Sequence, residues 1–152
     1  MNIEKRIENL GLMLPNASPA AALYVPVKQV GNIVFLAGHI PVQSGKLAYT
    51  GKVGKELTLT DAQDAARLCV INLIASLKAY LGDLDKVKSV IKVQAFVASE
   101  TGFMEQHLVA DAASKVLIDV FGDVGKHART AIGTNQLPLD APVEVEAIVE
   151  LY

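Results

Sequence analysis

Residues 126–152 read KHARTAIGTNQLPLDAPVEVEAIVELY and contain two candidate strands of different character. The first, residues 128–133, is short and apolar except for Arg129. The second, residues 143–152, follows a connection bounded by prolines and alternates between small apolar residues and mostly glutamates. Strict alternation is typical of a strand with one buried face. The sequence therefore predicts that the chain ends in two strands of one sheet.

Arg129 is the residue of this stretch that a packed strand does not require. If the two strands lie close together, its guanidinium can bind a planar carboxylate through two parallel hydrogen bonds. A glutamate of the last strand can then orient or deprotonate a water. The alternative is a cross-strand ion pair on a solvated face, which contributes little to stability. On the strand pattern alone, the ion pair is the simpler interpretation.

Composition limits the class of protein. The chain has 152 residues, of which 51% are hydrophobic and 20% charged, which suits one folded domain with a sizeable core. The net charge is −2 and aromatic residues make up 5%. These values argue against nucleic acid as a partner, because phosphate binding needs a basic surface.

Other features are informative mainly as exclusions. The single cysteine, Cys69, lies in an apolar run, so no disulfide within the chain is predicted. The three histidines are far apart in sequence, so no metal site is predicted. We expect no cofactor. Residues 1–7 are charged and lack an apolar signal core. No apolar run is long enough to span a membrane. We therefore expect a cytoplasmic protein without a membrane partner.

The rest of the chain predicts two long helices and several strands. Thr60 and Gln63 fit a capping box that opens the first long helix, and Gly82 and Gly122 fit the ends of the two helices. A short helix is expected over residues 3–10, and residues 33–37 are apolar enough for burial on both faces. The other expected elements are strands over 23–30, 87–97 and 128–133, a loop with one short strand over 43–57, and helices over 60–81 and 103–121.

This order predicts a single α+β domain over residues 1–152, with residues 1–20 as an N-terminal helix and loop extension. Its mixed β-sheet carries the two long helices on one face. Two helices cannot cover both faces. The other face carries Phe35, Ile132 and either the apolar half of the last strand or its alternate, and an apolar face of this size predicts self-association.

Four segments of the chain resemble one family, and one of them is the helix from Thr60 with the strand that ends at Phe96 and Val97, which match in order and spacing. Residues 30–41, VGNIVFLAGHIP, resemble its "VGN-LVF-SGQIP" stretch, and residues 143–148, VEVEAI, resemble its closing "VEIEAI" motif. Arg129 lies nine residues before Pro138 in the family's Arg…Leu-Pro pattern. The chain thus resembles the Rid family of reactive intermediate deaminases, also called the YjgF family and often named L-PSP endoribonuclease. The resemblance covers nearly all of the chain after about residue 20.

The resemblance implies a chorismate-mutase-like fold and a homotrimer around a central barrel, with sites in clefts between subunits. Arg129 is then expected to bind a substrate carboxylate and Glu144 to orient the attacking water. Tyr24 and Gly38 match the family's substrate-binding tyrosine and glycine. His39 and Ala131 occupy pocket positions where the family usually has glutamine and cysteine. This resemblance reverses the preference for a simple ion pair at Arg129.

Three functions follow from the resemblance and its departures. The first is hydrolysis of enamine or imine intermediates to 2-keto acids and ammonia, with a small-molecule carboxylate as partner. The second is binding of small 2-keto acids without chemistry, which the changes at Ala37, His39 and Ala131 favour. The third, RNA cleavage, rests on the family's common name alone. Ser114 and Leu117 also depart from the family's usual Asn and Tyr, so the chain resembles a divergent subgroup.

Overall fold

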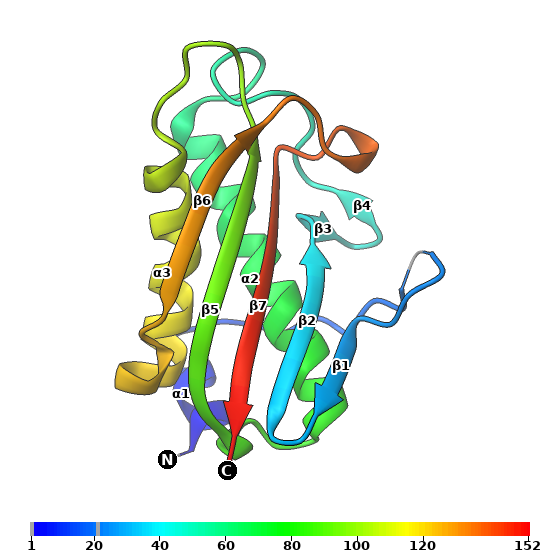
Figure 1. Cartoon of the computed structure of the whole chain (residues 1–152), viewed down its shortest axis with the longest axis vertical. Coiled ribbons are helices and arrows are strands. Elements are labelled where there is room, and N and C mark those ends of the chain that lie inside the picture. Colours follow the sequence, from blue (N-terminus) through cyan, green and yellow to red (C-terminus); the bar gives the residue numbers. More distant parts are fainter. Residues whose placement is uncertain (1, 21) are drawn as a thin grey trace.

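The computed structural model describes residues 2–20 and 22–152. Its largest element is a five-stranded sheet with two long helices packed on one face (Figure 1). This arrangement confirms the predicted α+β class and the predicted placement of the helices. The elements are α1 (Ile3–Asn9), β1 (Val27–Val30), β2 (Ile33–His39), β3 (Val42–Gln43), β4 (Lys46–Leu47), α2 (Leu59–Leu81), β5 (Val87–Ala98), α3 (Gln106–Phe121), β6 (Ala128–Thr134) and β7 (Val143–Leu151), with short 3-10 turns at Leu84–Lys86, Gly122–Gly125 and Pro138–Asp140.

The sheet has the strand order β1-β2-β7-β5-β6. The pair β5–β6 is parallel, and the pairs β1–β2, β2–β7 and β5–β7 are antiparallel. The last strand, β7, therefore lies in the middle of the sheet. The strand of Arg129, β6, lies at an edge, with β5 between the two. The two C-terminal strands belong to one sheet, as predicted, but they are not neighbours.

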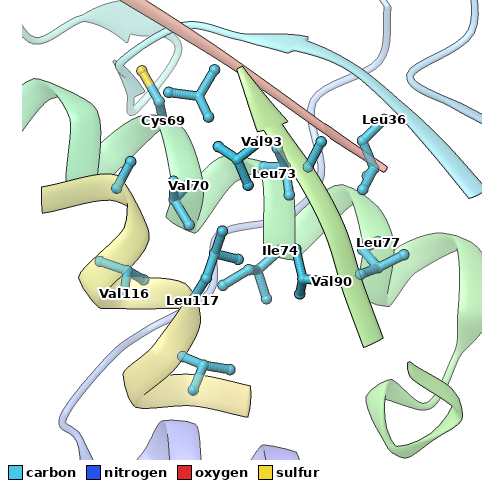
Figure 2. Close-up of a cluster of buried hydrophobic side chains, with 14 of the residues drawn as sticks. Leu36, Cys69, Val70, Leu73, Ile74, Leu77, Val90, Val93, Val116 and Leu117 are labelled. Carbon is cyan, nitrogen blue, oxygen red and sulfur yellow. The ribbon is translucent and has the colours of Figure 1, made fainter. Parts of the chain in front are cut away.

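The core lies between the sheet and the two long helices. Residues of α2, α3 and β5 interdigitate there, including Leu73, Leu117 and Val93, which are almost completely buried (Figure 2). An apolar stripe of α3 is buried along the whole length of the helix, from Val109 to Phe121. On β7, alternate residues from Val143 to Leu151 are buried and the residues between them are partly exposed. The alternation of β7 therefore selects which face packs against the helices.

The start of α2 differs from the prediction by two residues. Thr58 caps the helix, its hydroxyl accepting from the Asp61 amide at 3.2 Å, and Asp61 accepts from the Thr58 amide at 2.8 Å. The capping box is therefore Thr58–Asp61 and not Thr60–Gln63. Gln63 instead donates to the Leu108 carbonyl at 3.1 Å, which links α2 to α3. Asp61 is the third residue of the helix and accepts from the N-cap amide, as a glutamate does in the usual capping box. This box forms because the helix starts two residues earlier than predicted.

Other differences concern the ends of strands. The predicted strand over residues 23–30 forms only from Val27 onward, because Pro26 has no amide hydrogen to donate to a ladder. The strand predicted over 33–37 continues to His39, across an irregularity after Leu36. Residues 42–47 form a two-stranded hairpin where one short strand was expected. The helix predicted from residue 103 begins at Gln106.

The second face of the sheet is uncovered in the single chain. Val34 and Leu36 are buried, but Phe35 between them is 46% exposed, so residues 33–37 are buried on one face only. Ile132 on β6 is 44% exposed, and it lies beside Phe96 of β5 on this open face. The prediction of a strand buried on both faces does not hold for one chain.

The N-terminal segment packs on the same side as the helices. Ile3 and Ile7 of α1 are buried. The Ile3 amide donates to Asp85 Oδ1 at 2.8 Å, and Arg6 Nε donates to the Asp119 carbonyl near the end of α3 at 2.8 Å. Within the described ranges, no helix combines the length and apolar character that a membrane span requires.

Candidate functional site

Arg129 lies on the helix-facing side of the edge strand β6. It pairs in register with Val93, a buried core residue of β5. Its Nη1 donates to Asp111 Oδ1 at 2.8 Å and to Ser114 Oγ at 3.1 Å, and its Nη2 donates to the His107 carbonyl at 3.3 Å. The three partners are spaced along one side of α3, as i, i+4 and i+7. The helix therefore holds the end of a guanidinium whose side chain is 23% exposed.

His127 extends this hydrogen-bonded group. Its Nδ1 is 2.6 Å from the Gly125 carbonyl, and its Nε2 is 2.9 Å from Ser114 Oγ. A neutral ring with the proton on Nδ1 satisfies both contacts, because Ser114 can donate its hydroxyl proton to Nε2 while accepting from Arg129. Burial lowers the pKa of His127, and Arg129 lowers it further. The ring therefore acts as a neutral support for Ser114.

Glu144 is held by close packing on the opposite face. On β7 it lies between Val143 and Val145, which point into the core, so its own side chain points to the open face. There it covers Gly38 of β2. A Cβ on Gly38 would lie 2.8 Å from Glu144 Cδ and closer still to Oε1, so only glycine leaves room for this carboxylate.

The surroundings of Glu144 change its acidity. Burial raises the pKa of Glu144, and the nearby Glu146 raises it further. A carboxylate with a raised pKa is a stronger base once it is ionised. Glu144 is therefore suited to accept a proton from water.

Tyr24, Gly38 and His39 line one pocket of about 130 Å³. Residues of the N-terminal segment and of α2 complete its wall, and Asn72 closes it by donating to the carbonyls of Ile40 and Val42 at 3.1 and 2.9 Å. The structure thus brings together three of the residues that were predicted to bind substrate. Glu144 adjoins this group through Gly38, although it does not line the pocket itself.

His39 links β2 to α2. Its Nδ1 is 2.7 Å from the Ala37 carbonyl and its Nε2 is 2.8 Å from Ser76 Oγ, a buried hydroxyl. Burial lowers the pKa of His39, which favours the neutral ring with the proton on Nδ1. The ring therefore satisfies a buried serine while one edge borders the pocket.

Ala131 lies two residues after Arg129 on the same face of β6. It pairs in register with the buried Ala95 and packs against the edge of the core. Its methyl side chain offers no polar atom to a ligand. The prediction that Ala131 touches substrate requires a ligand on this side of the sheet.

The predicted site residues thus form two groups in the single chain. Arg129 and Ala131 lie beside α3, whereas Glu144, Gly38, His39 and Tyr24 lie beyond β5, toward the other edge of the sheet. The guanidinium and the Glu144 carboxylate point to opposite faces. One chain therefore does not bring the two proposed reacting groups together.

Sequence reasoning missed the partners of Arg129. Asp111 was not singled out, Ser114 was noted only as a departure from the family pattern, and His127 was considered only as one of three histidines too far apart in sequence for a metal site. The sequence feature that could have indicated these partners is the spacing of His107, Asp111 and Ser114 along one side of α3. That spacing points to Arg129 only when β6 is known to pack beside α3. Among the residues that the structure describes, no cluster of three His, Cys, Asp or Glu side chains could hold a metal ion.

Comparisons with known proteins agree on one family. Residues 4–151 match the family described as "YjgF/chorismate_mutase-like, putative endoribonuclease". Protein TCP17 of Trypanosoma cruzi is 42% identical over 98% of this chain and 94% of its own length. The structure of Atu1372 from Agrobacterium tumefaciens has 47% identity and a TM-score of 0.92, covering 99% of this chain and 92% of that one. A "putative endoribonuclease" from Shewanella oneidensis has 30% identity and a TM-score of 0.96, over 99% and 100% of the two chains.

Proposed function

Because the chain belongs to the YjgF/chorismate mutase-like family, we propose that it hydrolyses small 2-imino acids to 2-keto acids and ammonia in a site shared by neighbouring copies of a homotrimer. Arg129 binds the substrate carboxylate, and Glu144 of the adjacent copy activates the water.

The observation that carries this proposal is that the Arg129 guanidinium is held in place by hydrogen bonds and still has N–H groups that are unbonded within the described part of the chain. Contacts with Asp111, Ser114 and the His107 carbonyl occupy Nη1 and one hydrogen of Nη2. Among residues 2–20 and 22–152, no further acceptor bonds this group, so Nε–H and the second Nη2–H are available. A guanidinium edge of this kind matches the two oxygens of a carboxylate, and its orientation is fixed before the ligand arrives.

The chemistry asks little of the protein beyond orientation. Water adds to the C=N carbon while Glu144 accepts one of its protons and passes that proton to the imine nitrogen, which gives a carbinolamine. The carbinolamine then loses ammonia: the C–N bond breaks, the C=O bond forms, and the hydroxyl proton passes through Glu144 to the leaving nitrogen. The imine is already reactive, so holding it beside an oriented water supplies most of the acceleration. The raised pKa of Glu144 strengthens it as the proton acceptor.

A second copy of the chain is needed because Arg129 and Glu144 point to opposite faces of one sheet. The open face, with Phe35 and Ile132 nearly half exposed, is the surface that copies would cover around a central barrel. A cyclic arrangement applies the same contact three times and leaves no copy unpaired. In that arrangement each site takes its arginine from one copy and its glutamate from the next.

RNA cleavage has less support, although the family description includes that activity. His39 and His127 are both tied to a backbone carbonyl and a serine hydroxyl, and burial lowers the pKa of each. Neither ring is therefore free to act as one of a pair of acid and base groups. The net charge of −2 also disfavours a polyanionic substrate.

The test follows the loss of imine absorbance when a lyase generates 2-aminoacrylate in the presence of the protein. Arg129→Ala and Glu144→Gln are each expected to lower the acceleration about 100-fold or more. Mixing the two inactive variants, after unfolding and refolding together, is expected to restore roughly one quarter of the wild-type activity if each site combines two copies. Equal rates for wild type and Arg129→Ala would contradict the mechanism. Binding of 2-keto acids without acceleration would favour a binding protein.

A further inference from the structure

Asp111 is a charged residue in direct contact with Arg129 that the proposed reaction does not use. Its Oδ1 accepts from Arg129 Nη1 at 2.8 Å, and its side chain is 60% exposed. A partly exposed ion pair of this kind contributes little to stability. Because it contacts the arginine that is proposed to bind the substrate carboxylate, we looked to ligand binding for its role.

The contacts of the guanidinium divide its five N–H groups into two sets. Asp111 and Ser114 take both hydrogens of Nη1, and the His107 carbonyl takes one of Nη2. The remaining Nε–H and Nη2–H can bind the two oxygens of one carboxylate. Asp111 thus directs the ligand to one edge of the guanidinium by occupying the other.

A shallow pocket beside this guanidinium is lined by Ser114, Ile118, Lys126, His127 and Arg129, and we call it the hollow. The positive charges around the hollow are each paired with a carboxylate. Lys126, which lines the hollow with Arg129, is paired with Asp123 at 2.9 Å. The charge of Arg129 is already offset by Asp111. A ligand with one carboxylate gains two hydrogen bonds from Arg129. For a ligand with a second carboxylate, both nearby cations are already paired, so neither is free to offset the second negative charge. The Asp111 carboxylate also repels such a ligand more strongly, because the ligand carries two negative charges.

We propose that Asp111 positions Arg129 and selects ligands by charge, so that the site takes 2-imino and 2-keto monocarboxylates and rejects dicarboxylates of similar length. This inference rests on the proposed binding of a substrate carboxylate by Arg129. Beyond the proposed function, it specifies that the ligands are monocarboxylates and that Asp111 is the residue that discriminates against dicarboxylates.

Calorimetric titration with two 2-keto acids of equal chain length tests the inference. The acids are 2-oxopentanoate, with one carboxylate, and 2-oxoglutarate, with two. Wild type is expected to bind the monocarboxylate about 10-fold more tightly. Asp111→Asn keeps an oxygen acceptor for Nη1 but removes the charge. It is expected to raise affinity for 2-oxopentanoate about 3-fold and for 2-oxoglutarate about 10-fold, because the relieved repulsion scales with ligand charge.

Two further variants separate charge from position. Asp119→Asn removes the same charge two turns along α3, where Asp119 pairs with Lys115 at 2.8 Å, and is expected to change both affinities less than about 2-fold. Asp111→Ala removes charge and acceptor together. It is expected to shift the preference as Asp111→Asn does but to bind each acid about 3-fold more weakly than Asp111→Asn, because the guanidinium end is released.

The outcomes distinguish this inference from the proposed function. The change in preference caused by Asp111→Asn is expected to shrink in about 0.5 M salt, as a charge effect does and a purely structural one does not. If Arg129→Ala abolishes binding but Asp111→Asn leaves the preference unchanged, the inference fails alone. If wild type binds neither acid, or Arg129→Ala binds both as wild type does, the proposed function fails and this inference with it.

Discussion

Glu144 and Arg129 occupy their positions for different physical reasons. Glu144 is in the middle strand of the sheet and lies against Gly38, where a single added carbon would displace it. Arg129 is on an edge strand and is held by three hydrogen bonds to α3. Glu144 occupies space that only the missing side chain of Gly38 leaves open, whereas hydrogen bonds near solvent can be exchanged for water or a ligand. We therefore expect the two regions to respond differently to substitution.

Gly38→Ala is expected to have the largest effect, because its Cβ would overlap the Glu144 carboxylate. The free energy of unfolding should fall by no more than about 1 kcal/mol, because the overlapping atoms end a flexible side chain, but the rate of imine hydrolysis should fall about 100-fold as the carboxylate moves. Denaturant unfolding and the imine assay measure the two effects.

The control for this substitution is a double-mutant cycle. With Glu144→Ala as background, Gly38→Ala should cost little stability, because the overlapping atoms are gone. An equal cost in both backgrounds would show that the strain arises elsewhere in β2.

Two serines provide the next comparison. Ser76→Ala should lower the free energy of unfolding by about 2 kcal/mol, because the buried His39 Nε2 loses its partner. Ser114→Ala should cost only about 0.5 kcal/mol, since His127 and Arg129 can bond to water. Its effect should instead be a severalfold increase in KM with little change in stability. Similar unfolding curves for Ser76→Ala and Ser114→Ala would contradict the expectation that the region around His39 is more sensitive to substitution than the region around Arg129.

Acid should destabilise the fold through its two buried histidine rings. The pKa of His39 and that of His127 are lowered from 6.5 by burial. As pH falls below 6.5, the unfolded chain takes up these protons before the folded one does, so stability is complete above that pH and declines below it. Urea unfolding at about pH 7.5 and about pH 5.5 should show this decline.

Substitution of each ring assigns the effect. His39→Gln should flatten the pH dependence more than His127→Gln, because the serine that His39 contacts is buried and the one that His127 contacts is partly exposed. The reverse order would indicate that Arg129, which also lowers the pKa of His127, outweighs burial.

The smallest expected effect concerns the acidity of Glu144. Burial is the main cause of its raised pKa and Glu146 the lesser one. Glu146→Gln should therefore move the acid limb of the kcat/KM profile to lower pH by a small amount. Glu150→Gln is the matched control, since Glu150 is on the same face of β7 but pairs with Lys88 at 2.9 Å. A shift of equal size in both variants would exclude a specific influence of Glu146.

Much of the fold could be read from local pattern. The buried stripe of α3, the strand from Val87 and the alternation of β7 all followed from the spacing of apolar residues. Element starts were less accurate. The α2 capping box was placed two residues late because Thr58 and Thr60 both precede acceptable partners. Pro26 in the predicted strand over residues 23–30 indicated an edge strand, and β1 lies at an edge of the sheet, but the strand also starts later than predicted, after the proline.

The candidate site was predictable only in its residue types. Arg129 and Glu144 stood out as polar residues in apolar or alternating strands, and the family resemblance assigned roles to them. The contacts of Arg129 were not predictable, because Asp111 and Ser114 reach it only through the packing of α3 beside β6. Nor did the pattern indicate that β5 separates the two C-terminal strands, since strand order depends on connections across the whole chain.

By itself, the sequence determined the long helices, most of the strands and the apolar stripe of each helix, because these depend on periodicity and on residues within a few positions. It also determined that residue 38 would tolerate close approach, since glycine alone lacks a side chain. Tertiary structure decided which carboxylate uses that space and which helix holds Arg129. It also placed the two groups on opposite faces of the sheet. These features depend on residues far apart in the chain, and long-range contacts are set by the packing of complete elements.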